Sequence, residues 1–382
     1  MKKKILLITL MAAGLALAGC SRQIKKASRP STKTSQSSKK KVSKPDRITQ
    51  IMNKMTLDEK IGQLYFAHST GNFNQMKADI SKYHLGGTTL FGPDFKDRSK
   101  TQFKQEMQTY QSNSSYGLLI ATDQEGGTVS RINTNSKIST RKYPSPQEIY
   151  QIKGLNGIKQ EDSKVARILR ENGINMNFAP VADVARDRQS FIYDRTLGQN
   201  YEVTAKYIPI AVDAIQSQGV ASCLKHFPGY GDAADTHTGF AQINKPLTKY
   251  EQEDLLPFKA GIEAGVDSIM VSHIVIKGLD PNLPASLSPV VHKLLRKKLN
   301  YQGLILTDDL QMGAITQYAK KHNTNADVLA LKAGNDMLLG GNYQTGIPAI
   351  KKAIQTEQIS TSQIDHSVRR IFLLKEKLGI LK

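Results

Sequence analysis

The sequence contains little cysteine, with only Cys20 and Cys223 among 382 residues. Two cysteines allow at most one disulfide, and Cys223 is expected to be a small buried residue. Glycine and proline, at 28 and 14 residues, are too few for a fibrous or wholly disordered chain. With 39% hydrophobic residues, the chain can bury one large core or two modest ones.

Long apolar runs are also lacking, apart from one at the start. Lys2, Lys3 and Lys4 precede the apolar stretch 5–17, which is too short to span a bilayer comfortably. This pattern predicts a signal peptide over residues 1–19. It ends in Leu-Ala-Gly-Cys20, which resembles the bacterial lipoprotein box. The resemblance implies lipidation of Cys20, export, and anchoring to the outer face of the bacterial cell membrane; an ordinary cleaved signal is the alternative.

Acidic residues are scarce, with 33 Asp and Glu against 53 Lys and Arg, and the net charge is +20. Residues 1–47 contribute +12 of this charge, which leaves +8 for the remainder and gives little support to nucleic-acid binding. The segment 20–47 is rich in Ser, Thr and Lys and is expected to be a disordered basic linker. Its charge favours anionic lipid head groups or wall polymers. A solvated spacer without a binding role is the alternative.

From Ile48 to Lys382, short apolar runs alternate with amphipathic stretches. Most of the apolar runs are continuous, which is typical of parallel strands covered on both faces. The candidate strands are Ile61–His68, Gly86–Phe91, Gly117–Thr122, Met176–Val181, Val220–Lys225, Ser268–Ser272, Gly303–Thr307 and Asp336–Leu339.

Helical patterns lie between most of these strands, and several end at a glycine, a common stop signal. Thr56 and Glu59 have the spacing of a capping box. Pro209 is expected to kink one helix or mark its start. The pattern predicts an α/β fold, a (β/α)8 TIM-like barrel forming a single catalytic domain over 48–382, with a doubly wound open sheet as the alternative. Clear helical candidates are Gln160–Asn172, Val203–Gln218 and Tyr250–Ala264.

Polar residues follow five successive candidate strands directly. In a barrel these strand ends share one rim, where active sites of this fold lie. The residues are Asp123, Asp183, Lys225 with His226, His273, and Asp308.

Three longer motifs contain most of these residues. They are Asp123-Gln-Glu-Gly-Gly127, Lys225-His-Phe-Pro-Gly229 running on to Asp235-Thr-His237, and Thr307-Asp-Asp-Leu-Gln-Met312. With them the sequence resembles the family 3 glycoside hydrolases, in particular their single-domain bacterial β-N-acetylglucosaminidase (β-N-acetylhexosaminidase) branch. Supporting segments over 56–339 begin at Asn177, Arg195, Met270, Pro284 and Ala333.

The resemblance implies a retaining exo-glycosidase that hydrolyses terminal non-reducing β-linked N-acetylglucosamine. Asp308 matches the nucleophile that forms a covalent glycosyl intermediate. His237, paired with Asp235, matches the acid/base; an aspartate on one ring nitrogen fixes the tautomer and stabilises the cation. The glycine-rich stretch Gly229–Gly239 is expected to be a loop able to move over the site.

Five further residues match sugar-contacting positions of the family: Asp123, Arg131, Arg195, Lys225 and His226. For the two arginines, salt bridges at the rim are the alternative. His273, Asp183 and Asp309 are expected to support the rim rather than act on substrate.

The sequence departs from the family pattern at two positions. Tyr230 stands where the family commonly has His, and Thr128 where it commonly has Arg. These departures put the fit of the substrate and the closure of the loop in doubt, not the reaction class.

Other functions remain open. A metal-dependent hydrolase would use His226, Asp235, His237, His273 and Asp308 as ligands, whereas the family resemblance implies neither metal nor cofactor. A non-catalytic carbohydrate-binding lipoprotein and a β-glucosidase-like enzyme are further alternatives. The chain ends soon after the eighth strand, so we expect no second domain to supply the acid. The expected substrate is a small oligosaccharide or muropeptide from peptidoglycan turnover, and the expected state is a monomer.

Overall fold

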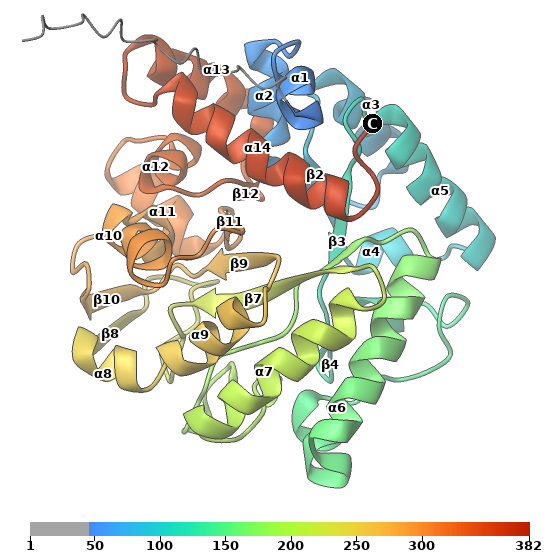
Figure 1. Ribbon diagram of the computed structural model, residues 1–382, viewed down its shortest axis with the longest axis vertical. Helices are drawn as coiled ribbons and strands as arrows, with labels where there is room; N and C mark the ends of the chain where they lie inside the picture. The colour runs from blue at the N-terminus through green and yellow to red at the C-terminus, as the bar shows by residue number, and fades with distance from the viewer. Residues whose placement is uncertain (1–45) are drawn as a thin grey trace, which may run out of the picture. The chain divides into compact units, whose positions relative to one another are not determined.

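The computed structural model describes residues 46–382, a ring of strands surrounded by helices (Figure 1). The predicted signal peptide, Cys20 and nearly all of the predicted linker lie outside these residues. Asp46 belongs to the folded part, because its side chain accepts a 2.8 Å hydrogen bond from the Thr49 N–H and caps helix α1 (Arg47–Met52). The folded part thus includes Asp46 and Arg47, which the sequence pattern assigns to the linker. No helix within 46–382 is long and apolar enough to cross a membrane.

Eight parallel strands form the central sheet in the order β11-β9-β7-β6-β3-β2-β1-β12. A parallel bridge between Leu306 and Met337 joins the two outer strands and closes the ring, so the predicted (β/α)8 barrel is confirmed and the doubly wound alternative is wrong. The strands are β1 (Tyr65–His68), β2 (Gly87–Leu90), β3 (Leu119–Thr122), β6 (Met176–Asn177), β7 (Ala221–Phe227), β9 (Ser268–Val271), β11 (Leu304–Thr307) and β12 (Leu338–Leu339).

Burial explains the continuous apolar character of these strands. Every residue of β2, β3, β7, β9 and β11 is buried, because side chains on one face fill the barrel and those on the other meet the helices. Two short strand pairs stand outside the barrel. They are β4 (Gln124–Gly126) with β5 (Val129–Ser130), and β8 (Gln242–Pro246) with β10 (Val275–Gly278).

The helices lie outside the ring of strands (Figure 1). After α1 they are α2 (Leu57–Gln63), α3 (Phe73–Lys82), α4 (Gly92–Phe95), α5 (Lys100–Asn113), α6 (Pro146–Glu171), α7 (Tyr201–Gln216), α8 (Leu247–Gln252), α9 (Leu255–Glu263), α10 (Pro289–Lys293), α11 (Gly313–Lys321), α12 (Ala326–Ala333), α13 (Tyr343–Gln355) and α14 (Thr361–Lys377).

The predicted capping box opens α2, with the Glu59 carboxylate 2.7 Å from the Thr56 N–H. Two other expectations were wrong in detail, and for a third the structure excludes one of its two alternatives. The first turn of the predicted strand 61–68 is helical and belongs to α2. The predicted helix 250–264 is interrupted between α8 and α9. Pro209 lies inside α7 rather than at its start, because Asn200 caps that helix.

The first and last helices of the described chain contact each other. Arg369 in α14 forms an ion pair with Asp46, at 2.6 Å. The Arg47 guanidinium donates to the Leu381 carbonyl at 3.2 Å. The two ends of residues 46–382 are therefore held side by side.

Candidate active site

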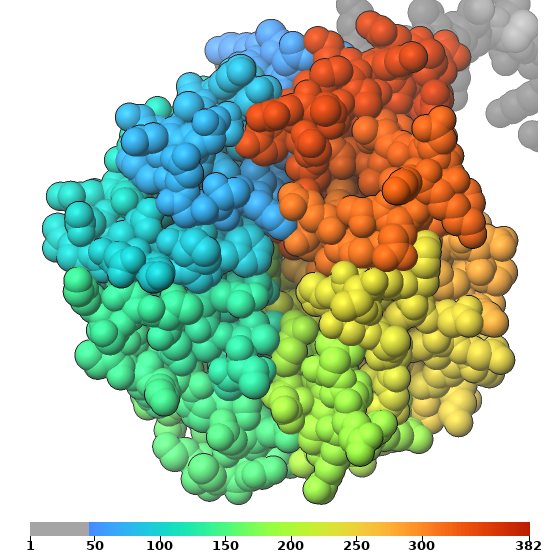
Figure 2. Space-filling model, turned by 180° about the vertical axis from the view of Figure 1, so that it is seen from behind, coloured from blue at the N-terminus to red at the C-terminus, as the bar shows by residue number. Residues whose placement is uncertain are grey.

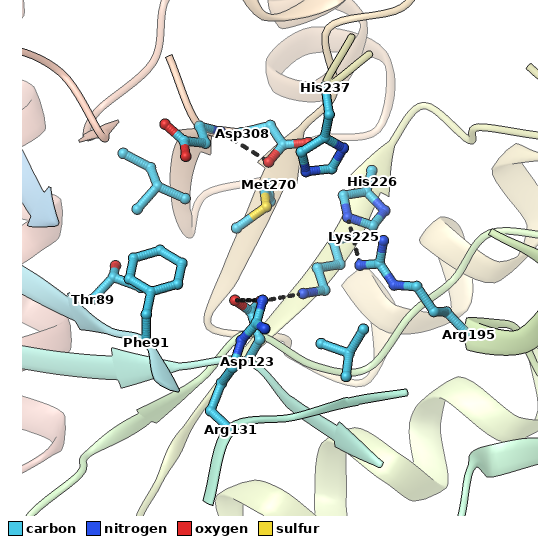
Figure 3. Close-up of a pocket in the computed structure, with 13 residues that line it drawn as sticks. Thr89, Phe91, Asp123, Arg131, Arg195, Lys225, His226, His237, Met270 and Asp308 are labelled. Atoms are coloured by element: carbon cyan, nitrogen blue, oxygen red, sulfur yellow. Dashed lines mark hydrogen bonds and ion pairs between the residues drawn. The ribbon is translucent and has the colours of Figure 1, made fainter. Parts of the chain in front are cut away.

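The strand ends surround a cavity of about 260 Å³ (Figure 3). Seven residues that the sequence nominated for catalysis or sugar binding line it. The eighth, Asp235, contacts one of these seven, His237. The opposite view of the molecule shows segments from along the whole chain meeting near the centre of one face (Figure 2). The lining residues are Thr89, Phe91, Asp123, Val129, Arg131, Arg195, Lys225, His226, His237, Met270, Asp308, Asp309 and Leu339.

Asp308 follows β11 directly and is half-buried in the wall of this cavity. Its N–H donates to the last residue of β9 at 2.8 Å, which fixes the backbone, and its Oδ1 accepts from the Asp309 N–H at 2.9 Å. Burial by itself would raise the pKa of this carboxyl. The neighbouring His226 and His273 rings, the Asp309 N–H and the Lys225 charge outweigh burial and hold the pKa below its usual value. Asp308 is therefore an ionised carboxylate, as a nucleophile must be.

His237 and Asp235 form the expected pair. The His237 Nδ1 lies 2.5 Å from the Asp235 Oδ1, which also accepts the His237 N–H at 2.9 Å. An ionised carboxylate only accepts, so Nδ1 carries a proton and the ring orientation is fixed. Figure 3 shows the imidazole beside the Asp308 carboxylate. The side chain of His237 is 60% exposed, so protons can exchange with solvent.

Lys225 lies at the base of the cavity between two carboxylates. Its Nζ is 2.7 Å from the Asp123 Oδ1 and 2.6 Å from the Glu125 Oε1. Burial alone would lower the pKa of Lys225, but the charges of Asp123 and Glu125 outweigh it and raise the pKa. Lys225 is therefore a fixed cation, suited to donate hydrogen bonds to sugar hydroxyls.

Glu125 organises the site, although the sequence did not nominate it. Its two oxygens accept a forked pair of hydrogen bonds from Arg195, at 2.9 and 2.8 Å. The Arg195 fork, expected to bind sugar, is thus occupied by a carboxylate, and the salt-bridge alternative applies to this arginine. Glu125 stands inside the first quoted motif, but nothing in the sequence shows that it reaches Lys225.

Arg131 lies at the mouth of the cavity. Its guanidinium is 3.7 Å from the Asp123 Oδ2 and 5.7 Å from the centre of the Phe91 ring. It is only about a third exposed, so it can face a bound sugar while keeping its contact with Asp123.

His226 is oriented from behind by Asp183. One carboxylate oxygen of Asp183 lies 2.7 Å from the His226 Nδ1 and accepts the His226 N–H at 3.1 Å. The other oxygen accepts the Tyr230 N–H at 2.7 Å. These contacts turn the His226 Nε2 toward the cavity, where it lies 3.4 Å from Arg195.

His273 and Asp309 contact other parts of the rim rather than presenting free atoms. The His273 ring contacts the Ser286 hydroxyl at 2.7 Å and the Asp309 carbonyl at 2.8 Å, and burial lowers the pKa of His273. The Asp309 carboxylate is 3.1 Å from the His68 Nε2. Both ring nitrogens of His273 are occupied, and residues 46–382 contain no group of three His, Cys, Asp or Glu arranged to hold a metal ion. The ligand set of the metal-dependent alternative is not assembled.

The sequence missed the apolar wall of the cavity. Phe91 follows β2 and Leu339 ends β12, as the polar candidates follow or end their strands, while Met270 is the last residue but one of β9. In the sequence these three residues are indistinguishable from ordinary barrel core, because an apolar residue at a strand end carries no chemical signal.

The two departures from the family pattern lie in different environments. Thr128 is exposed on the turn between β4 and β5. Tyr230 is buried at the base of the loop, where its hydroxyl bonds to that of Thr236.

Comparison with known proteins identifies the family. The glycosyl hydrolase family 3 N terminal domain matches residues 56–374. The chain belongs to glycosyl hydrolase family 3. A protein named beta-hexosaminidase A from Pseudoalteromonas piscicida is 32% identical over 334 residues, which cover 78% of this chain and 54% of that protein. A beta-hexosaminidase from Nitrosomonas eutropha is 29% identical over 299 residues, with coverages of 76% and 84%.

Solved structures with a similar fold support this assignment. The family 3 beta-N-acetylglucosaminidase from Paenibacillus sp. matches with a TM-score of 0.77 and 29% identity, covering 85% of this chain and 63% of that one. LpqI of M. tuberculosis matches with a TM-score of 0.78 and 27% identity, covering 86% and 96%. The chain thus spans about half the length of the Pseudoalteromonas relative but nearly all of LpqI.

Proposed function

We propose that the chain is a β-N-acetylhexosaminidase that removes terminal non-reducing β-linked N-acetylglucosamine with retention of configuration. One observation carries the proposal: the ionised, half-buried carboxylate of Asp308 and the imidazole of His237, which is hydrogen-bonded to Asp235, line the same cavity. The family membership and the hexosaminidase names of the relatives support it.

The reaction has two steps. In the first, an Asp308 oxygen bonds to the anomeric carbon as the bond to the leaving oxygen breaks, and protonated His237 gives its Nε2 proton to that oxygen. In the second, neutral His237 takes a proton from water, whose oxygen displaces Asp308 and releases the sugar. Asp235 stabilises the imidazolium and holds its ring in place.

The remaining polar residues would bind the terminal sugar. Lys225 donates to ring hydroxyls, Asp123 accepts from them, and His226 forms a hydrogen bond with a hydroxyl through its Nε2. Arg131 closes the mouth of the cavity, and Arg195 acts through Glu125 by fixing the position of Lys225. No metal or cofactor takes part in this scheme.

We also propose that the enzyme is exported, anchored by lipid on Cys20, monomeric, and active on peptidoglycan fragments. The signal-like start and the Leu-Ala-Gly-Cys20 sequence support the anchor. Replacing Cys20 by Ala should release the protein from the membrane fraction of a bacterial host; retention there would contradict lipid anchoring.

Paired aryl β-N-acetylglucosaminide and β-glucoside substrates, with and without phosphate, test the function directly. We expect release from the first substrate in water. Preference for the glucoside would favour the β-glucosidase alternative, and binding without cleavage would favour the carbohydrate-binding one. Near-wild-type turnover in Asp308→Ala would reject the nucleophile assignment. A His237→Ala variant that slows poor leaving groups no more than good ones would reject the acid.

A further inference from the structure

The loop that carries the acid/base, residues 229–241, is docked on helix α11. The N–H groups of Gly313 and Ala314, at the start of α11, donate to the carbonyls of His237 and Thr236, both at 3.1 Å. The Gln317 side chain donates to the Thr238 carbonyl at 3.3 Å. Three consecutive loop carbonyls are therefore held by one helix. The yellow segment near residue 240 lies beside the orange segment near residue 310 in Figure 2.

Helix α11 is also the helix that follows the nucleophile. Asp308 and Gly313 are separated by four residues, and the Asp309 carboxylate accepts the Gln311 N–H at 2.8 Å within that connection. A single strand–helix unit therefore determines where both Asp308 and His237 lie.

The docking requires glycine at position 313. A β-carbon there would lie 2.7 Å from the His237 carbonyl oxygen and 3.0 Å from the Thr238 carbonyl carbon, both backbone atoms. Real contacts of that type are essentially never so short, so a side chain would push the loop off the helix.

Tyr230 holds the same loop from its inner side. Its hydroxyl bonds to the Thr236 hydroxyl, and its ring packs edge-on against His226 and Phe191, with centroids 5.5 and 5.1 Å apart. Its N–H is fixed by Asp183. Thr236 is thus held by Tyr230 through its side chain and by α11 through its carbonyl.

We propose that Gly313 and Tyr230 are positioning residues. They hold the acid/base loop, and with it His237, in a fixed position relative to Asp308. Neither touches the reacting atoms. This proposal rests on the proposed function for its kinetic consequence, while the docking itself is independent of it. Because proton transfer depends steeply on geometry, a displacement of about 1 Å can cost ~100-fold. We therefore expect a displaced loop to slow mainly the steps in which His237 donates a proton to the leaving oxygen.

The test compares Gly313→Ala with Gly92→Ala. Both glycines are the first residue of a helix that follows a barrel strand, but a β-carbon at Gly92 meets only the Thr134 methyl, at 3.4 Å. We expect Gly313→Ala to lower kcat about 10- to 100-fold on aryl glycosides with poor leaving groups, and much less on activated ones. Gly92→Ala should match wild type on both.

Hydrogen–deuterium exchange provides a readout that does not require activity. Amides of 231–241 should exchange faster in Gly313→Ala than in wild type or Gly92→Ala. Unchanged exchange would overturn the docking. Faster exchange with equal slowing of all leaving groups would overturn the positioning role. If wild type has no glycosidase activity, the proposed function fails, while exchange still decides the docking.

Tyr230→Phe and Thr236→Val test the inner contact. Each removes one hydroxyl and should slow poor leaving groups several-fold, and the double variant should be no worse than the worse single one, because both remove the same bond. Fully additive losses would show that Tyr230 does not act through Thr236.

Discussion

Lys225 and Glu125 form a 2.6 Å salt bridge in which the two side chains are only 2% and 1% exposed. Glu125 also accepts the two forked hydrogen bonds of Arg195, so one buried carboxylate neutralises two cations. These charges sit beside the cavity that we assign to the sugar. The bridge is therefore a structural requirement of the site rather than a surface contact.

Replacing Glu125 by Gln should destabilise the protein, because it leaves two buried cations with less compensation. We expect a loss of roughly 3–5 kcal/mol in the free energy of unfolding, measured in urea. Asp213→Asn is the matched control, since Asp213 pairs with Lys159 at the surface, where such pairs are worth at most ~1 kcal/mol. Equal losses in the two variants would contradict the role of Glu125.

Asp235→Asn should preserve the shape of the loop but remove the charge that stabilises the His237 cation. We expect kcat on substrates with poor leaving groups to fall on the order of 100-fold, with a smaller effect on activated ones. Kinetics across a series of aryl leaving groups would show the difference. A uniform decrease would indicate that Asp235 supports the loop and not the proton transfer.

Chelation should leave the activity unchanged. The scheme needs no metal, and His273 uses both ring nitrogens within the protein. The measurement is turnover of an aryl β-N-acetylglucosaminide before and after dialysis against EDTA, with a zinc-dependent hydrolase treated in parallel. Loss of activity that is restored by added Zn²⁺ would revive the metal-dependent alternative.

Lys375 should make stability depend on pH above neutrality. It is fully buried, its Nζ donates to the Gln63 amide oxygen and the Gly117 carbonyl, and burial lowers its pKa to about 7. The unfolded chain, with a pKa near 10.5 for lysine, holds the proton over a range where the folded protein has lost it. The contribution of Lys375 to the free energy of unfolding therefore rises with pH between about 7 and 10.5, by up to ~1.4 kcal/mol per pH unit.

Urea unfolding of wild type and Lys375→Met at several pH values tests this dependence. The free energy of wild type relative to the variant should increase from pH 7 to pH 10. Lys352→Met, at an exposed lysine, serves as the control. A difference between wild type and Lys375→Met that stays constant with pH would show that Lys375 titrates alike in both states.

The barrel could be predicted because its strands are covered on both faces and therefore appear as apolar runs. The same property caused the error at residues 61–63, since a buried helical turn is as apolar as a buried strand. The interruption between α8 and α9 has a different origin. Lys245 pairs with both Glu253 and Asp254 at the break, a contact from outside the helix that local sequence does not reveal.

The site was predictable where a residue type, a strand end and a family motif coincided, as for Asp308 and His226. It was not predictable where a residue acts on another residue distant in sequence. Glu125 reaches Lys225 across 100 positions, and Arg195 reaches Glu125 across 70. The sequence pattern named cations that line the cavity, but it could not determine which anion each one contacts.

The ion pair between Asp46 and Arg369 has a practical consequence for engineering. Because the ends of the described chain meet, a short linker could join them, and new termini could be opened in an exposed loop without crossing the barrel. A fusion partner added after Lys382 would then be attached close to Asp46, the first residue that the structure describes. A pulling force applied at Asp46 would act first on the contact between α1 and α14.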